Sequence, residues 1–254
     1  MGSNLEFGDL VQIIDNKDRR YSLVLEPDGE FQNHHGNLKH SDIVGKPQGS
    51  KVETSRGQEF TVLKPTLSEF LISMPRGAQI IYPKDIGAII MLADIAPGVK
   101  VFESGLGSGA LSTSMLRIGA LIKGYEIRED FAGRAKNNVK KFLGEQALEN
   151  YDVEINDSYE GIPDQDFDRV VLDLPEPWKV IPHVPGKLLP GGVFVSYSPS
   201  VMQVSKVDEA LKSSGFTEIT VTEVLHRTWH VNGQAVRPDH RMVAHTGFLT
   251  RARI

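Results

Sequence analysis

A glycine-rich stretch with an acid at its start is the most informative part of the sequence. It runs Glu103-Ser-Gly-Leu-Gly-Ser-Gly109, between a β-rich segment and a segment of helical character. Glycines there allow tight turns and close approach of the backbone to a ligand, and the following helix offers free amide donors. The spacing is G-x-G-x-G rather than the G-x-G-x-x-G of dinucleotide sites, and Glu103 suits a ligand with a cationic amino group. The stretch predicts an S-adenosyl-L-methionine site formed by Glu103, Gly105, Leu106, Gly107, Ser108, Gly109, Ala110 and Leu111.

Further polar and aromatic candidates follow the next two expected strands. Glu126 ends the second strand, seventeen residues past Gly109, where a carboxylate can accept both hydroxyls of a ribose. Asp157 follows the third strand and could accept a hydrogen bond from an adenine amino group. Phe131, at the start of the following helix, could pack on the adenine or belong to the core. The carboxyl ends of parallel strands share one edge of a sheet, so we expect these residues to gather there.

The stretch Asp173-Leu-Pro-Glu-Pro-Trp178 follows the fourth expected strand. Its prolines stiffen the loop and remove backbone donors, so the loop can hold a carboxylate and an aromatic face toward a flat substrate. Asp173 could alternatively cap a helix. We predict a chemical role for Asp173, because methylation of a ring nitrogen leaves a cationic base, and a nearby carboxylate stabilises charge that develops in the transition state.

Two kinds of sequence pattern divide the chain. Short β-rich runs separated by turn residues predict a small β domain over residues 1–66. From about residue 95, apolar strands alternate with helical stretches, which is typical of a parallel sheet with crossover helices. Residues 67–254 therefore predict a Rossmann-like α/β domain with helices on both faces. The expected strands of this domain are 99–102, 120–125, 151–155, 167–172, 192–197, 216–225 and 243–250, and the expected helices are 67–74, 111–118, 129–143 and 201–213.

Composition narrows the chemistry further. The 254 residues include no cysteine, which excludes thiolate nucleophiles, cysteine zinc sites and disulfides. The longest uncharged apolar run, residues 86–93, is too short to cross a membrane, so we expect a cytoplasmic protein. The net charge is -5, so any affinity for nucleic acid must come from local distribution. Candidates for such contacts are Lys39, Lys46, Lys51, Arg56, Arg76, Arg227, Arg237, Arg241, Arg251 and Arg253.

Four ordered motifs resemble those of one family. They are Gly77-Ala-Gln-Ile-Ile-Tyr-Pro-Lys-Asp85, the glycine stretch, the Asp173 loop and Ala235-Val-Arg-Pro-Asp-His240. Together they are similar to the TrmI-type tRNA (adenine-N1)-methyltransferases, class I methyltransferases that act at position 58 of the T-loop, and the similarity covers nearly the whole chain.

The resemblance implies specific roles. The glycine stretch, Glu126 and Asp157 would hold S-adenosyl-L-methionine, Asp173 would contact the target adenine, and Tyr82 would stack near it. Because adenine N1 is normally paired within the T-loop, we expect the base to be flipped out against Tyr82 or Trp178. Arg237 and His240 would shape the edge of the site or contact RNA, with structural packing as the alternative. The family is usually tetrameric, so a homotetramer is expected, held by packing and polar contacts.

Other readings remain open from the sequence. A methyltransferase for another substrate and a non-catalytic tRNA-binding subunit are the main alternatives, although the intact glycine stretch, Glu126 and Asp173 argue against the second. A nicotinamide-dependent reductase fits poorly because the glycine spacing differs. The histidine pairs lack the glutamate of a zincin motif, and we expect no metal.

Overall fold

The computed structural model describes residues 4–75, 77 and 79–254. Its contacts divide the chain into two compact units, Met1–Ser73 and Met74–Ile254. The sequence suggested a boundary after residue 66, and in the structure the short helix α1 (Leu67–Ser73) clusters with the first unit. Arg76, a candidate for RNA contact, and Ala78, in the first of the four motifs, lie outside the described residues.

The first unit is a small antiparallel β domain. Its main sheet has the order β2-β1-β6-β5, and a separate hairpin of β3 and β4 packs its apolar side chains into the same core. Phe31 of the hairpin lies 5.8 Å from Phe60 of β6 and 5.1 Å from Tyr21 of β2, measured between ring centroids. The sequence did not indicate the hairpin, because its strands are short and polar. The strands are β1 (Leu10–Asp15), β2 (Arg20–Val24), β3 (Glu30–Asn33), β4 (Gly36–Lys39), β5 (Lys51–Glu53) and β6 (Glu59–Leu63).

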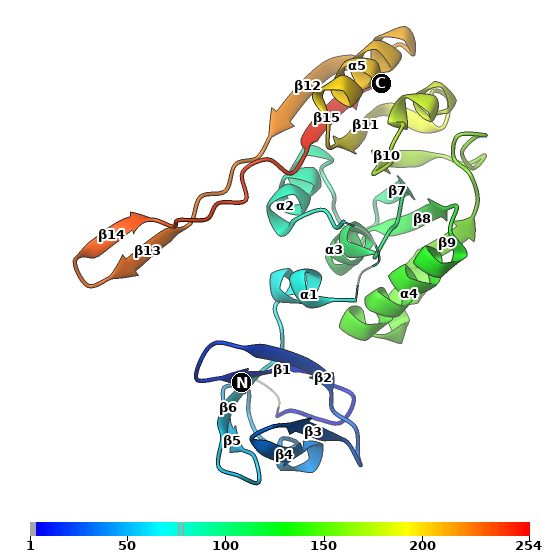
Figure 1. Ribbon diagram of the computed structural model, residues 1–254. Helices are drawn as coiled ribbons and strands as arrows, with labels where there is room; N and C mark the ends of the chain where they lie inside the picture. The colour runs from blue at the N-terminus through cyan, green and yellow to red at the C-terminus, as the bar shows by residue number, and fades with distance from the viewer. Residues whose placement is uncertain (1–3, 76, 78) are drawn as a thin grey trace. The chain divides into compact units, whose positions relative to one another are not determined.

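The second unit is built on a seven-stranded sheet with the order β12-β15-β11-β10-β7-β8-β9 (Figure 1). Strands β7 to β11 are parallel, and β15 runs antiparallel between β11 and β12. The predicted Rossmann-like α/β sheet is thus confirmed, and the structure adds antiparallel pairing at one end. The strands are β7 (Lys100–Ser104), β8 (Leu121–Glu126), β9 (Tyr151–Ile155), β10 (Phe167–Leu172), β11 (Leu188–Ser198), β12 (Thr217–Glu223) and β15 (Phe248–Arg253).

The strand order places helices on both faces of this sheet. The chain moves outward from β7 to β9, then returns to β10 on the other side of β7, and right-handed crossovers therefore cover opposite faces. The point of reversal lies between β7 and β10, where ligands bind in open α/β sheets. The helices of this unit are α2 (Pro83–Leu92), α3 (Ala110–Ile118), α4 (Glu129–Leu143) and α5 (Val201–Ser213), with 3-10 turns η2 (Glu145–Asn150), η3 (Pro177–Lys179) and η4 (Ile181–His183). The 3-10 turn η1 (His40–Asp42) belongs to the first unit.

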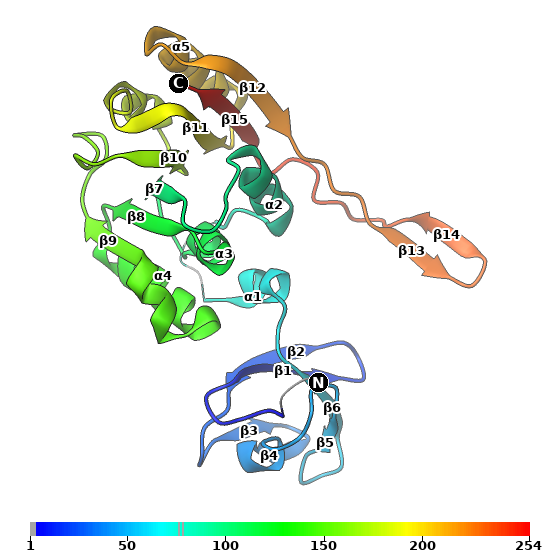
Figure 2. The same cartoon turned by 180° about the vertical axis from the view of Figure 1, so that it is seen from behind.

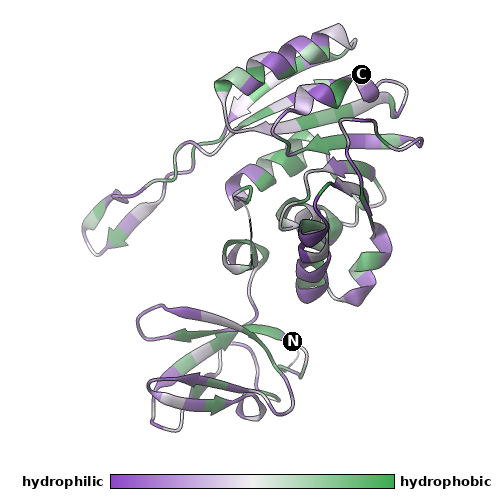
Figure 3. Cartoon of the chain, turned by 45° about the vertical axis from the view of Figure 1, so that its right-hand side comes forward, coloured by the Kyte–Doolittle hydropathy of each residue, from purple (hydrophilic) through white to green (hydrophobic). Residues whose placement is uncertain are grey.

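Alternate side chains of β7 face opposite sides of the sheet, so one residue packs in the core while the next is directed toward α3. Phe102 is buried in a core with Phe167 and Phe194 of neighbouring strands, on the face covered by α5. Successive side chains of a strand point to opposite faces, so Glu103 is directed to the other face, toward α3. The apolar colour of the central strands in Figure 3 follows this core. No helix in the described part of the chain has the length and apolar character needed to span a membrane.

Between β12 and β15 the chain forms an arm that the sequence did not indicate. Its two strands, β13 (Trp229–Asn232) and β14 (Ala235–Pro238), pair only with each other. Figures 1 and 2 show this hairpin projecting from the sheet. Several large apolar side chains on the arm are exposed: Leu225, Trp229, Val231, Val236, Met242 and Val243.

The root of the arm is tied to α2 by a buried charged cluster. Lys84 donates to Asp85 Oδ1 at 2.8 Å, to the Val224 carbonyl at 2.6 Å and to Thr246 Oγ1 at 2.6 Å. Thr246 Oγ1 in turn donates to Asp85 Oδ2 at 2.6 Å. Val224 and Thr246 stand at the two ends of the arm, so one ammonium group holds both ends against the first turn of α2. The cluster is built from Lys84 and Asp85, which close the first of the four motifs.

Loss of one partner from this cluster should be costly. In Lys84→Met, Asp85 stays buried without its cation, and we expect the free energy of unfolding to fall by about 3 to 5 kcal/mol. Lys212→Met is the matched control, because Lys212 pairs with Asp208 on the exposed surface of α5 and should change stability by less than about 0.5 kcal/mol. Urea unfolding of both variants provides the measurement. Equal losses would show that the Lys84 cluster contributes no more than a surface pair.

Candidate active site

Four neighbouring strands end at one edge of the sheet, and the predicted cofactor residues follow them. A cavity of about 200 Å³ opens there. Glu126 from the end of β8 and Asp157 from the loop after β9 both line it, beside Gly105 from the loop after β7. The structure thus brings these three sequence-predicted residues together. The other lining residues are Ser104, Tyr125, Ile127, Asn156, Ser158, Tyr159, Leu174 and Pro175.

The glycine stretch is shaped by close contact with its neighbours. Gly105 has φ +87°, and a Cβ at this position would lie 2.0 Å from the carbonyl oxygen of Asp173. The Asp173 amide donates to the Ser104 carbonyl at 2.9 Å, so the loops after β7 and β10 lie directly against each other. Gly109, with φ +76°, begins α3, and its Cβ would lie 2.9 Å from Cα of Ala135 on α4. Only glycine is compatible with both the backbone angles and these contacts.

The rest of the stretch leads into α3. Leu106 and Ser108 are buried, and the Ser108 carbonyl accepts from Asn138 Nδ2 at 2.9 Å. Ala110 and Leu111 form the buried first turn of the helix. The described cavity therefore meets this stretch mainly through Gly105.

Glu126 supports the glycine stretch as well as facing the cavity. Its Oε2 accepts from the Gly107 amide at 3.2 Å, and its Oε1 accepts from the Arg128 amide at 3.1 Å. The carboxylate is almost fully buried. It therefore fixes the loop after β7 relative to the end of β8, a role that sequence spacing did not indicate.

Glu103 is a buried carboxyl group without a full set of partners. It is 1% exposed, and its Oε2 has no hydrogen-bond partner. Burial raises the pKa of Glu103 to about 8, hydrogen bonding from Ser112 opposes this rise, and the charges of Asp173 and Glu126 add to it. Buried polar atoms are usually satisfied, so the free oxygen requires a donor that the described residues do not supply.

Asp173 lies in the same electrostatic environment. Burial raises the pKa of Asp173 to about 7, and the nearby charge of Glu126 contributes to the rise. Glu103, Glu126 and Asp173 thus form a group of three acids whose negative charges disfavour one another. A ligand with a cationic amino group and a sulfonium would supply both the missing donor and the missing positive charge. The residues present therefore fit S-adenosyl-L-methionine.

The far side of the cavity suits a purine. Asp157 Oδ1 accepts from the Tyr159 amide at 2.9 Å, which fixes the carboxylate at the rim. Ile127, which the sequence argument missed, is an apolar side chain left 63% exposed beside Glu126. The sequence pattern that could have indicated Ile127 is an apolar residue directly after the acid that ends a strand. Phe131 is buried, does not line the cavity, and lies under the Arg128 guanidinium at 3.8 Å from the ring centroid.

Aromatic residues gather near Asp173 on its other side. Tyr197, at the end of β11, was not singled out from the sequence. Burial together with the charges of Asp85 and Asp173 raises the pKa of Tyr197 to about 12, and Tyr82 contributes to the same shift. Its hydroxyl donates to the Thr246 carbonyl at 2.5 Å. Tyr82, immediately before α2, and Tyr197 are therefore both close to the group that holds the arm.

Two other predicted contacts lie elsewhere in the chain. Trp178 packs against the core beneath α5, and Lys206 Nζ lies 4.6 Å from its ring centroid, so part of this indole already serves packing. Arg237 is on β14 and His240 follows that strand, both in the projecting arm (Figure 2). The structure does not bring these two residues to the cavity of the same chain.

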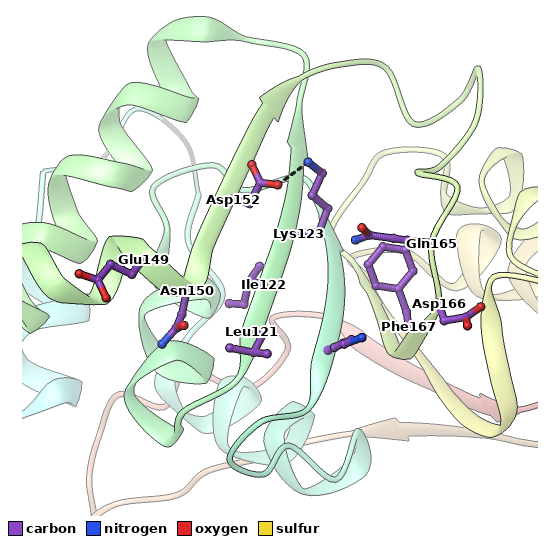
Figure 4. A pocket seen from close by; sticks show the side chains of 10 residues that line it. Leu121, Ile122, Lys123, Glu149, Asn150, Asp152, Gln165, Asp166 and Phe167 are labelled. Carbon is purple, nitrogen blue, oxygen red and sulfur yellow. Dashed lines mark hydrogen bonds and ion pairs between the residues drawn. The ribbon is translucent and has the colours of Figure 1, made fainter.

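A larger cavity of about 480 Å³ lies at the opposite edge of the sheet (Figure 4). It lies near the amino ends of β7 and β10 and contains no residue of the four motifs. Lys123, its most buried cation, is already paired with Asp152 at 2.5 Å and with Glu154. Its charges are thus partly neutralised within the protein, unlike the three acids. Among the described residues, no group of three His, Asp or Glu side chains is placed to hold a metal ion.

Comparison with known proteins agrees with this geometry. Residues 59–237 match the model of the family described as the tRNA methyltransferase complex GCD14 subunit, and residues 4–52 match a TrmI-like N-terminal domain. The chain belongs to the GCD14/TrmI methyltransferase family. Within the family it is 35% identical to the tRNA (adenine(58)-N(1))-methyltransferase TrmI of Thermus thermophilus, over 94% of each chain. It is 34% identical to the Methanocaldococcus jannaschii tRNA (adenine(57)-N(1)/adenine(58)-N(1))-methyltransferase TrmI, over 95% of this chain and 94% of the relative.

Solved structures of similar proteins extend this relation to the fold. The tRNA (m1A58) methyltransferase TrmI from Aquifex aeolicus superimposes with a TM-score of 0.81 at 29% identity, covering 98% of each chain. A Thermotoga maritima protein described as a SAM-dependent O-methyltransferase gives 0.91 at 31% identity, covering 99% of this chain and 94% of that one. The predicted class I methyltransferase fold and the family are both confirmed.

The buried acids lead to a prediction for Glu103→Gln. The folded-state pKa of Glu103, about 8, lies above its ordinary value of 4.5, so the stability of the unliganded protein should fall as pH rises between these values. The amide cannot ionise, so the variant should be more stable than the wild type at pH 9, by about 1 to 3 kcal/mol. It should also bind S-adenosyl-L-methionine at least about tenfold more weakly, because a charged acceptor is lost.

Thermal unfolding between pH 5 and 9 and titration calorimetry measure these two effects. Glu160→Gln, at an exposed position outside the cavity, is the control and should change neither quantity. A Glu103→Gln profile that parallels the wild type would contradict the proposed charge state.

Proposed function

We propose that this protein transfers a methyl group from S-adenosyl-L-methionine to N1 of adenine 58 in the T-loop of tRNA. The observation that carries the proposal is the group of three acids, Glu103 and Glu126 buried and Asp173 partly buried beside the glycine stretch, in a chain that aligns along nearly its whole length with enzymes named for this reaction. The catalytic part corresponds to residues 67–254, and the β domain of residues 1–66 serves another purpose.

The cofactor would be held by residues of the cavity and its rim. Glu103 would accept from the amino group, Glu126 from the ribose hydroxyls and Asp157 from the adenine amino group. Ile127 would cover one face of the adenine, while Phe131 would support this region from beneath Arg128. The backbone of the glycine stretch, including Leu106, Ser108, Ala110 and Leu111, would enclose the amino acid end.

When bound, the cofactor would supply an electrophilic methyl group: a bond to N1 of the adenine would form as the methyl–sulfur bond breaks, and neutral S-adenosylhomocysteine would leave. Asp173 would accept from the exocyclic amino group of the base and oppose the positive charge that forms on the ring. Tyr82 would hold the flipped base by stacking, and Trp178 would provide a second aromatic surface at the loop. Burial, with a contribution from the charge of Glu126, raises the pKa of Asp173, and a cationic ligand would restore the carboxylate that this role requires.

A second candidate is methylation of an oxygen acceptor. The resemblance to the Thermotoga maritima protein described as an O-methyltransferase favours it. In that reaction the acceptor hydroxyl must lose a proton, so Asp173 would act as a base instead of a charge stabiliser. A non-catalytic tRNA-binding subunit is less compatible with three neighbouring acids, of which Glu126 lines the cavity and Glu103 is buried without a full set of partners.

We also propose that the protein acts in the cytoplasm as a homotetramer. The support is the arm, because an isolated two-stranded hairpin is marginally stable in water and its exposed apolar side chains form a patch suited to a protein interface. The occupant would be a second copy of the chain. Arg237 and His240, carried on the arm, would then contact tRNA at a neighbouring subunit.

The central test compares Asp173→Asn with Asp168→Asn, a control at the other end of β10 whose carboxylate accepts from the Lys100 amide. Mass spectrometry of nucleosides after incubation with tRNA should show 1-methyladenosine for the wild type and the control. Asp173→Asn should lower kcat by about 100-fold or more while still binding cofactor. A 2′-O-methyl or protein product would favour the second candidate, and near-normal turnover by Asp173→Asn would remove this residue from the mechanism.

The arm predicts an effect on assembly. Val231 and Val236 face each other across the hairpin and are 68% and 59% exposed, so Val231→Glu/Val236→Glu should weaken subunit association by at least about tenfold without unfolding the monomer. Leu189→Glu, at an exposed apolar position at the start of β11, is the control. Analytical ultracentrifugation over a concentration series measures association. A tetramer unaffected by the double substitution would place the subunit contacts elsewhere.

A further inference from the structure

The loop that carries Asp173 has few backbone groups with which to hold itself in place. It lies between β10 and η3 and belongs to no strand or helix. Two of its residues, Pro175 and Pro177, have no amide hydrogen. After Asp173 itself, Leu174 and Glu176 are the backbone donors that remain before η3. The conformation of the loop therefore depends on side chains from other elements.

Two side chains from different segments supply these contacts. The phenolic oxygen of Tyr159, in the loop after β9, accepts from the Glu176 amide at 3.1 Å. Glu176 stands three residues after Asp173, so this hydrogen bond holds the later part of the loop. The second contact comes from α5, where Gln203 Nε2 donates to the Pro175 carbonyl at 2.8 Å. Consecutive residues of the loop are thus clamped from outside.

Tyr159 is itself fixed by several contacts. Its amide donates to Asp157 Oδ1 at 2.9 Å, and its carbonyl accepts from His183 Nε2 at 3.0 Å. The ring is partly buried and packs against the core on the face covered by α5, and Lys179 Nζ lies 5.2 Å from its centroid. A hydroxyl carried by such a restrained side chain can define the position of the amide that it meets.

The contacts of Tyr159 also connect the cofactor cavity with the Asp173 loop. Asp157 and Tyr159 both line the cavity, and Asp157 is the expected acceptor for the adenine amino group. The Asp157 carboxylate holds the Tyr159 amide, and the Tyr159 hydroxyl holds the Glu176 amide. One side chain therefore spans the distance from the rim of the cavity to the loop. The position of the loop is in this way tied to residues that line the cavity.

We propose that Tyr159 is a positioning residue for methyl transfer, whose hydroxyl sets where the Asp173 carboxylate lies relative to the bound cofactor. The inference rests on the proposed function, because it assigns a further residue to the same reaction. Asp173 has to meet the exocyclic amino group of the base at hydrogen-bond distance, and a small displacement of such a geometry lowers the rate steeply. Tyr159 acts through the loop and takes no proton from the reacting groups.

The test removes the hydroxyl and keeps the ring. Tyr159→Phe leaves the Glu176 amide without its acceptor, while the ring can still pack against the core. Tyr21→Phe is the matched control, because it removes the same hydroxyl from a partly buried tyrosine of the β domain. Methylation of tRNA is measured for both variants, alone and combined with Asp173→Asn. Hydrogen exchange of the Glu176 amide, followed by mass spectrometry, reports on the clamp without relying on activity.

We expect Tyr159→Phe to lower kcat by about tenfold, while KM for tRNA and the Kd of S-adenosyl-L-methionine change by less than about twofold. In the Asp173→Asn background the same substitution should lower kcat by less than about twofold, because residues that act as a unit are not additive. The Glu176 amide should exchange faster in Tyr159→Phe than in the wild type and in Tyr21→Phe.

Several results would overturn the inference. A kcat of Tyr159→Phe within about twofold of the wild type would do so, as would the full tenfold loss repeated in the Asp173→Asn background. A loss expressed only as weaker cofactor binding would assign Tyr159 to cofactor contact instead. Unchanged exchange at Glu176 would remove the clamp itself. A wild type that forms no 1-methyladenosine, with exchange at Glu176 still faster in the variant, would overturn the proposed function and leave the clamp in place.

Discussion

Three carboxyl groups near the ends of adjacent strands, with no cation supplied by the described residues, are the constraint on which the rest of the site depends. Glu103 and Glu126 are buried and Asp173 is partly buried, and removal from water together with the neighbouring negative charges raises the pKa of Glu103 and Asp173. A fold tolerates such a group when a ligand completes it, because the ligand recovers the electrostatic free energy that folding leaves unsatisfied. The sheet supplies the required rigidity, with parallel strands fixing the spacing of their ends.

The other charged cluster of the second unit differs from the three acids because its opposite charges are paired within the protein. Lys84, Asp85 and Thr246 hydrogen-bond to one another, Lys84 also donates to the Val224 carbonyl, and together they fix α2 and both ends of the arm. Tyr82 precedes this cluster directly in the chain, and Tyr197 reaches it through the Thr246 carbonyl. The side chains expected to receive the base are thus held by a closed network, while the acids that face the ligand are left open. A small shift at the root of the arm would therefore displace the aromatic residues near Asp173.

Distribution of charge resolves an apparent conflict between a net-acidic chain and a polyanionic substrate. The negative excess includes the group of Glu103, Glu126 and Asp173, whose charges suit a cationic ligand. The net charge of the chain is thus a poor guide to its binding partners, and the local placement of charged residues is a better one.

The sequence by itself determined which candidate site residues follow the ends of the apolar strands: the glycine stretch, then Glu126, Asp157 and Asp173. That succeeded because parallel strands bring their carboxyl ends to one edge whatever their separation in the chain. It missed the β3–β4 hairpin, helix α2 as an element and the arm, whose strands are short or exposed and lack a periodic apolar pattern. Only the tertiary structure decided that Glu126 also holds Gly107, that Phe131 lies outside the cavity, and that Tyr197 stands near Asp173. Such contacts depend on packing between segments distant in sequence, and no local pattern of residue types encodes them.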